Sequence, residues 1–125
     1  MRNYTNYIGI PFKYGGRDRK ALDCYGLYML LSKELDGVQV PDVTSPDTLE
    51  VIADVVSVEK LKWRECGLEE GALVLFSIKG YGAHVGYVTG PDTMIHTWEK
   101  TNGVTIERLS RGWTHRILGC YKYED

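Results

Sequence analysis

Hydrophobic and polar positions repeat with two different periods along the chain. In the first half, apolar residues recur at the spacing of one helix face. The residues on this face are Cys24, Leu27, Tyr28, Leu31 and Leu35. Asp23 precedes them as a residue type that caps helix N-termini, and Gly37 follows as a helix terminator. The pattern predicts a helix that begins at Cys24 and ends at Gly37.

A second helical pattern follows a linker rich in glycine, proline and aspartate. Ser45-Pro46-Asp47 is typical of a helix start, and apolar residues then recur at helical spacing to about Ser57. We therefore expect a second helix there.

The second half of the chain changes to short β-branched and aromatic runs separated by glycine-containing turns. These runs are residues 72–78, 84–89, 93–98, 104–109 and 116–123. Helices followed by strands predict an α+β domain in which N-terminal helices pack on a sheet of about five antiparallel strands.

Length and composition favour one domain, residues 1–125. The chain has 125 residues, of which 43% are hydrophobic and 26% charged, and its net charge is -2 without long runs of either sign. Neither nucleic acid nor an anionic membrane surface is expected as a partner. The first ten residues lack the continuous apolar core of a signal peptide, and no stretch approaches the roughly 20 apolar residues of a membrane span.

The three cysteines are spaced without a CxxC pair. Cys24, Cys66 and Cys120 therefore indicate neither a disulfide framework nor a structural zinc site, and we expect no metal and no cofactor. Cys66 and Cys120 have no base at a suitable spacing, so we expect both to react more slowly than Cys24.

Cys24 is the strongest candidate for a nucleophile. The unpaired N–H groups of a helix N-terminus carry partial positive charge, which stabilises a thiolate. The alternative is that Cys24 is a small buried hydrophobe, the commoner role of cysteine.

Two of the three histidines fall on neighbouring predicted strands joined by a tight turn at 90–92. Opposed side chains of antiparallel strands lie about 5 Å apart, so His84 and His96 can share a face and form a hydrogen bond. Each histidine alone could be a core residue, but together with Cys24 they offer a thiol, a base and a group that orients the base. His115 lies in a turn-like segment, where we expect a structural or exposed role.

These residues resemble the NlpC-type cell-wall peptidases, which are papain-like cysteine enzymes. The matching segments are residues 10–16, 23–27, 70–76, 84–88 and 94–96, so the resemblance spans nearly the whole chain. It implies a papain-like fold and hydrolysis of amide bonds in peptidoglycan stem peptides. It also implies Cys24 as nucleophile, His84 as general base and acid, and His96 as the orienting residue, with the N–H of Cys24 in an oxyanion hole.

The resemblance also suggests substrate-binding residues near the nucleophile: Phe12, Tyr14, Asp23 and Tyr25. Many family members have tyrosine where this chain has Phe12, and serine where it has Tyr25. Both positions belong to substrate recognition in family peptidases that read a free peptide N-terminus. Asp23 matches the family's acid beside the nucleophile and could contact the substrate amine as well as cap the helix.

Within this family the chain looks like the small peptidase domains of phage tails. The Asp23–Gly26 tetrapeptide and the segments 35–41 and 116–121 carry this likeness. It implies synthesis in the host cytoplasm, assembly with tail-tip or tail-hub proteins, and a place in the tail tip of the virion. Two alternatives remain open: a structural tail-tip component that keeps the peptidase fold, and a cytosolic thiol acyltransferase or amidase on the same scaffold.

Overall fold

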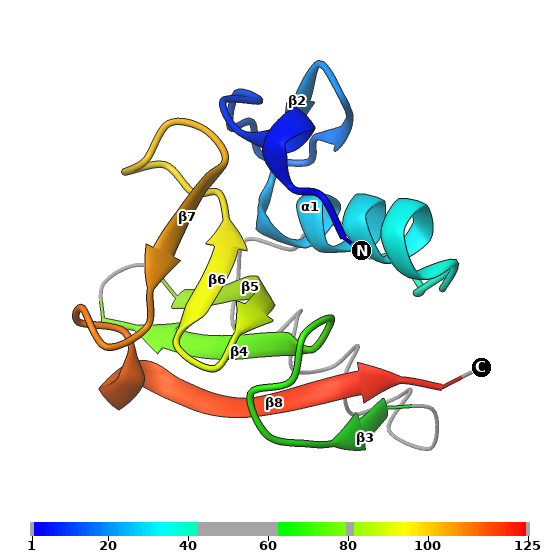
Figure 1. The fold of residues 1–125 in the computed structure, drawn as a ribbon. Helices are drawn as coiled ribbons and strands as arrows, with labels where there is room; N and C mark the ends of the chain where they lie inside the picture. The colour runs from blue at the N-terminus through cyan, green and yellow to red at the C-terminus, as the bar shows by residue number, and fades with distance from the viewer. Residues whose placement is uncertain (1, 43–62, 80–81, 125) are drawn as a thin grey trace.

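The computed structural model describes residues 2–42, 63–79 and 82–124. Within these ranges the fold is α+β and papain-like, as predicted. One α-helix lies on one face of a six-stranded antiparallel sheet, and a two-stranded sheet lies near the start of that helix (Figure 1). The second predicted helix, from Pro46 to about Ser57, lies outside the described residues.

The large sheet contains all five predicted strands and one more. Its strands are β3 (Trp63–Glu65), β4 (Leu73–Ile78), β5 (Gly82–Gly90), β6 (Thr93–His96), β7 (Thr105–Arg108) and β8 (Ile117–Tyr123). The spatial order is β3-β8-β4-β5-β6-β7, and every pairing is antiparallel. The sequence analysis missed β3 because three residues are too few to establish an alternating pattern.

Helix α1 (Cys24–Leu31) begins where the sequence predicted. The side chain of Asp23 accepts a hydrogen bond from the backbone N–H of Gly26 at 2.7 Å, which caps the first turn. A π-helical segment, η2 (Ser32–Asp36), extends α1 and ends at Gly37, whose φ of 66° is left-handed. The predicted helix is therefore continuous to Gly37, although its last turn is wider than an α-helix.

The loop before α1 packs closely on the start of the helix. It contains the short hairpin of β1 (Arg17–Asp18) and β2 (Ala21–Leu22). A Cβ at Gly26 would lie 2.1 Å from the carbonyl oxygen of Gly16, a separation that no side chain can tolerate. Gly26 therefore lets the loop and the first turn of α1 meet.

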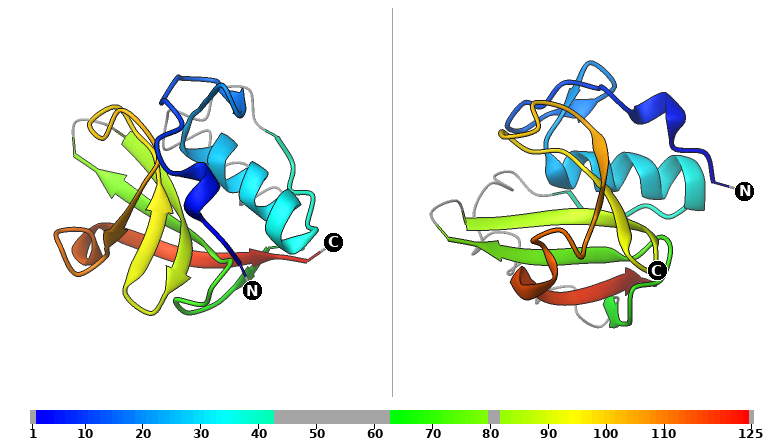
Figure 2. Two further views of the ribbon diagram at one scale, coloured as in Figure 1. Left: turned by 45° about the horizontal axis from the view of Figure 1, so that its top comes forward. Right: turned by 60° about the vertical axis from the view of Figure 1, so that its left-hand side comes forward.

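Two short 3-10 helices complete the described chain. η1 (Thr5–Tyr7) lies near the N-terminus, and η3 (Thr114–Arg116) precedes β8 and contains His115. Two further views show the N-terminal segment and α1 together on one side of the sheet (Figure 2).

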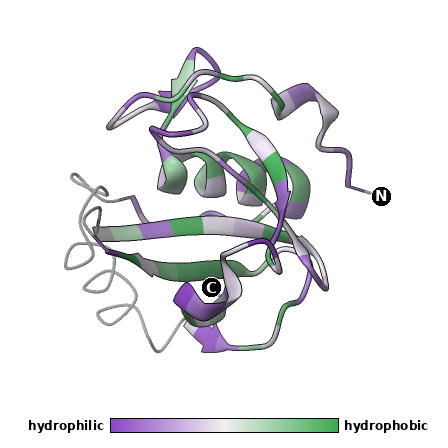
Figure 3. Cartoon of the chain, turned by 90° about the vertical axis from the view of Figure 1, so that its left-hand side faces the viewer, coloured by the Kyte–Doolittle hydropathy of each residue, from purple (hydrophilic) through white to green (hydrophobic). Residues whose placement is uncertain are grey.

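The core is divided into two clusters by the sheet. Side chains alternate along β4, so Leu73 and Leu75 face α1, whereas Val74 and Phe76 face away from it. We name the first group, which includes Cys24, the helix-side cluster, and the second the far-side cluster. Members of the far-side cluster are Ala72, Val74, Phe76, Ile78, Val88, Met94, Trp98, Leu109, Trp113 and Cys120. Figure 3 shows hydrophobic positions concentrated on α1 and the strands beneath it.

No helix among the described residues is long and apolar enough to cross a membrane.

Candidate active site

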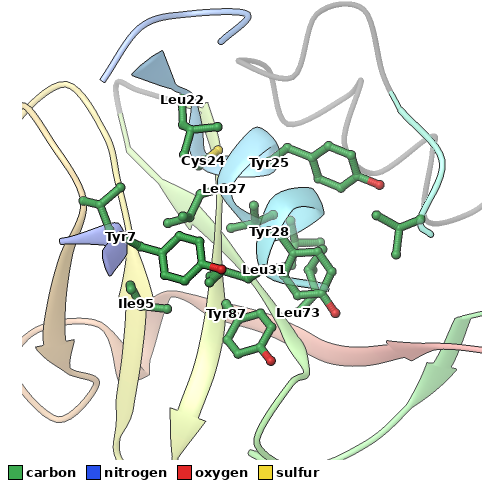
Figure 4. Packing of buried hydrophobic residues seen from close by; sticks show 14 of the residues in the cluster. Tyr7, Leu22, Cys24, Tyr25, Leu27, Tyr28, Leu31, Leu73, Tyr87 and Ile95 are labelled. Atoms are coloured by element: carbon green, nitrogen blue, oxygen red, sulfur yellow. The ribbon is translucent and has the colours of Figure 1, made fainter. Parts of the chain in front are cut away.

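Cys24 is the first residue of α1, and its side chain is buried in the helix-side cluster, with 5% of its surface exposed. Figure 4 shows it close to Leu22 at the start of the helix. The backbone N–H groups of Val85 and Tyr25 are directed at the sulfur. The thiol therefore lies against strand β5 at the residue that follows His84.

The surroundings of Cys24 disfavour the ionised form of its thiol. Burial raises the pKa of Cys24 to about 12, and the negative charge of Asp23 acts in the same direction. The N–H groups of Val85 and Tyr25 oppose this effect but are weaker. The sequence analysis expected the helix N-terminus to stabilise a thiolate. In the structure desolvation acts in the opposite direction and is the larger effect, because a charged sulfur would lose its water.

Asp23 is also buried, and its carboxylate is occupied by neighbouring donors. One oxygen accepts hydrogen bonds from Gly26 N at 2.7 Å and from the Arg17 guanidinium at 2.7 Å. The other oxygen accepts from Gly15 N at 2.9 Å. The predicted capping role is confirmed, and Asp23 in addition ties the preceding loop to α1. Contact with a substrate amine stays a prediction.

His84 and His96 form the hydrogen-bonded pair that the sequence predicted. Nε2 of His84 and Nδ1 of His96 lie 2.8 Å apart, and both side chains are fully buried. The register of β5 and β6 pairs Tyr87 with Ile95, which puts His96 opposite Gly86. The two imidazoles are therefore diagonal neighbours on one face rather than directly opposed residues.

Aromatic rings of the far-side cluster surround His84. The ring centroids of Phe76, Trp98 and Trp113 lie 5.8, 5.3 and 5.5 Å from that of His84. Burial lowers the pKa of His84 well below its usual value of 6.5, and His96 lowers it further. His84 is therefore a neutral imidazole at pH 7, the form that a general base requires.

Glu107 is a third member of this hydrogen-bonded group, and the sequence analysis missed it. One carboxylate oxygen lies 2.5 Å from Nε2 of His96, and the other accepts from the indole N–H of Trp113 at 3.4 Å. The hydrogen bond with His96 lowers the pKa of Glu107. Glu107 pairs with Met94 across β6 and β7, so it faces the same side as His96. The alternation of side chains along residues 104–109 could have indicated in the sequence that Glu107 shares a face with His96.

The remaining predicted substrate-binding residues differ in exposure. Tyr25 is buried, and its hydroxyl donates to the carbonyl oxygen of Pro41 at 2.6 Å. Tyr14 is 47% exposed and donates to a carboxylate oxygen of Glu99 at 2.6 Å. The ring of Phe12 meets that of Tyr14 edge-on at 4.9 Å and packs against the far-side cluster. Of these residues, Phe12 and Tyr14 reach the surface near the helix start.

The other candidate residues are not part of the hydrogen-bonded group of His84, His96 and Glu107. Cys66 and Cys120 are free thiols, half-buried and buried respectively. His115 is exposed in η3, in agreement with the sequence analysis. Within residues 2–42, 63–79 and 82–124, no group of three or more histidine, cysteine or acidic side chains is arranged to hold a metal ion.

Comparison with known proteins identifies the family of the chain. Residues 9–122 match the profile of the NlpC/P60 family. The chain belongs to the NlpC/P60 family. Over 110 residues it is 27% identical to an Escherichia coli K12 protein named Murein DD-endopeptidase MepS/Murein LD-carboxypeptidase, covering 88% of this chain and 53% of that protein. This NlpC/P60 chain thus spans about half the length of the curated relatives it matches.

Solved structures of family members share the fold. An NlpC/P60 family protein from Bacillus cereus ATCC 10987 superposes with a TM-score of 0.64 at 21% identity, covering 95% of this chain and 37% of that one. The NlpC/p60 domain of the peptidoglycan hydrolase SagA superposes with a TM-score of 0.60 at 18% identity, covering 95% and 91%. At these identities the likeness concerns the fold.

Proposed function

We propose that this NlpC/P60 domain is a cysteine endopeptidase that hydrolyses amide bonds in the stem peptides of peptidoglycan. The observation that carries the proposal is the hydrogen bond between His84 on β5, the strand against which the thiol of Cys24 lies, and His96 on the neighbouring strand β6. Family membership and the murein-peptidase name of the Escherichia coli relative support the substrate class.

The proposed reaction begins from two neutral groups. Nδ1 of His84 takes the proton of the Cys24 thiol while the sulfur attacks the carbonyl carbon of the scissile amide. The tetrahedral intermediate then collapses, and the imidazolium returns the proton to the leaving amine as the C–N bond breaks. Water, activated by the same imidazole, hydrolyses the thioester and releases the carboxylic acid, which regenerates the thiol.

The start of α1 would stabilise the intermediate. The backbone N–H of Cys24 is one of the unpaired donors of the first helical turn, and such donors favour a developing oxyanion. His96 would hold the ring of His84 in place through the 2.8 Å hydrogen bond.

The test is to incubate the purified protein with sacculi of different wall chemotypes and to identify the released fragments by mass spectrometry. Stem-peptide fragments with new carboxyl and amino ends are expected from the unmutated protein and not from Cys24→Ala. Release that continues undiminished in Cys24→Ala would rule out thiol catalysis. No release from any chemotype would favour a structural tail-tip component, and amide exchange on small substrates alone would favour the acyltransferase or amidase alternative.

We also propose that the domain is carried in a phage tail tip and helps the phage to penetrate the host cell wall. This part rests on the likeness of the Asp23–Gly26 tetrapeptide and of segments 35–41 and 116–121 to tail-borne peptidase domains. Mass spectrometry of purified virions and of isolated tails tests it, because the proposal requires the protein in both preparations.

A further inference from the structure

Three polar side chains from three neighbouring strands form one line of hydrogen bonds on the far side of the sheet. His84 on β5 contacts His96 on β6 at 2.8 Å, and His96 contacts Glu107 on β7 at 2.5 Å. Both imidazoles are fully buried, whereas the Glu107 side chain is 33% exposed. The line therefore runs from the interior to a carboxylate at the surface.

The chemistry of Glu107 sets the direction of these hydrogen bonds. An ionised carboxylate only accepts, so Nε2 of His96 must carry a proton and donate it. If His96 carries one proton, Nδ1 holds a lone pair and accepts from Nε2–H of His84. The lone pair of His84 is then on Nδ1, the other ring nitrogen, which in this tautomer is the nitrogen able to take up a proton.

Three further features favour an ionised Glu107. Its carboxylate reaches solvent, and its second oxygen accepts a hydrogen bond from the indole N–H of Trp113. Trp113 is a donor only, so it too requires an acceptor at this position. The pKa of Glu107 is lowered, chiefly by the hydrogen bond with His96.

We propose that Glu107 is a positioning residue that selects the catalytic tautomer of His84 through His96. It touches neither the thiol nor the substrate; it directs the proton of each imidazole to Nε2 and so leaves Nδ1 of His84 unprotonated. This inference rests on the proposed peptidase function for its consequence, but the tautomers themselves can be observed without any substrate.

The decisive measurement is ¹⁵N NMR of the histidine rings, which distinguishes a protonated nitrogen from one with a lone pair. The chain has three histidines, and His115→Gln removes the signals of the exposed one, so two rings remain to assign. At neutral pH the unmutated protein should carry the proton of His84 and of His96 on Nε2. In Glu107→Gln, whose amide can donate as well as accept, both rings should gain an Nδ1–H population.

Kinetics supply the second measurement. Glu107→Gln should lower kcat by at least about tenfold with little change in KM, because substrate binding is untouched while the base is in the wrong tautomer for part of the time. Glu107→Asp keeps the charge and should restore part of the rate and the Nε2–H tautomers. Glu65→Gln, a loss of an exposed carboxylate on β3, is the matched control and should change neither.

Several results would overturn the inference. They are a His84 that carries its proton on Nδ1 in the unmutated protein, a doubly protonated His96, or tautomers that stay the same in Glu107→Gln. Equal loss of activity in Glu65→Gln would point to a nonspecific charge effect and would also count against it.

The role of Glu107 and the proposed function can fail separately. If no wall is hydrolysed but Glu107→Gln still shifts the tautomers, the proposed function fails and the role of Glu107 stands. If walls are hydrolysed but the tautomers stay unchanged in Glu107→Gln, the peptidase function stands and the role of Glu107 fails.

Discussion

The two sides of the sheet supply different parts of the candidate active site. On the helix side, Cys24 lies in an apolar cluster whose burial raises the pKa of its thiol to about 12. On the far side, His84 lies among aromatic rings whose burial lowers the pKa of its imidazole well below 6.5. Desolvation thus acts on both groups, but with opposite sign, because each is kept in its neutral form.

Burial therefore disfavours the ionised form of both groups and acts against a thiolate–imidazolium pair before substrate binds. In the proposed reaction, proton transfer from Cys24 to His84 would accompany attack on the substrate, and the helix start and His96 would stabilise the developing charges. The two sides also differ in the exposure of their carboxylates. Glu107, which is linked to the imidazoles, is partly exposed, whereas Asp23, which lies beside the thiol, is buried.

The largest effect is expected for Cys24→Ala. Loss of the nucleophile should lower wall hydrolysis by about 10⁴-fold or more, because no other group in the site can form the covalent intermediate. The unfolding free energy should change by only about 1 kcal/mol, since a methyl group fills most of the same space. Activity assays and denaturant titrations measure both; a large loss of stability would mean that the thiol is chiefly a packing group.

His84→Ala should lower the stability of the protein more than Cys24→Ala does. Activity should again be lost, but here the truncated ring leaves a cavity among Phe76, Trp98 and Trp113, at a cost of about 2 to 4 kcal/mol. Thermal melts of both variants provide the comparison. Equal melting temperatures for the two would contradict the tight aromatic packing around His84.

Acid should destabilise the protein by protonating His84 and Glu107 on the far side of the sheet. Below pH 6.5 the unfolded chain binds a proton at His84 that the folded chain excludes. The unfolding free energy therefore decreases as the pH is lowered, by up to about 1.4 kcal/mol per pH unit. Below pH 4.5, Glu107 adds to this loss, because its pKa is lowered in the folded state and the unfolded chain is protonated first.

Denaturant titrations at pH 7.5, 6.0 and 5.0 test this prediction, with His84→Gln as the variant that cannot titrate at position 84. The variant should lose less stability than the unmutated protein over this range. Identical pH dependence in the two proteins would show that His84 is protonated as readily when folded as when unfolded.

The smallest effect concerns the order in which the thiols react. Cys66 is half-buried, whereas Cys24 and Cys120 are buried and their pKa values are raised to about 12 and 11. A bulky maleimide at neutral pH should therefore label Cys66 first, the reverse of the order expected from the sequence. A peptide-like electrophile that fits the site should label Cys24 first. Peptide mapping after limited labelling distinguishes the sites, and Cys24 labelled first by both reagents would contradict its burial.

Much of the fold follows from local patterns that the sequence displays directly. The start of α1 was predictable because Asp23 caps the helix through a contact three residues away. The pairing of His84 with His96 was predictable because a tight turn joins their strands and restricts the register. Such features depend on residues that are close in the sequence, so local patterns are enough to predict them.

Other features were decided only by contacts between distant segments. The charge state of Cys24 depends on how completely the loop, α1 and β5 exclude water from the thiol, and the helix-start pattern led to the opposite expectation. Glu107 joins His96 because β7 lies beside β6 and presents the same face. Local sequence patterns identified Cys24, His84 and His96 as the residues that could perform the chemistry. Their protonation and their partners came from the folded chain, since burial and cross-strand contact exist only there.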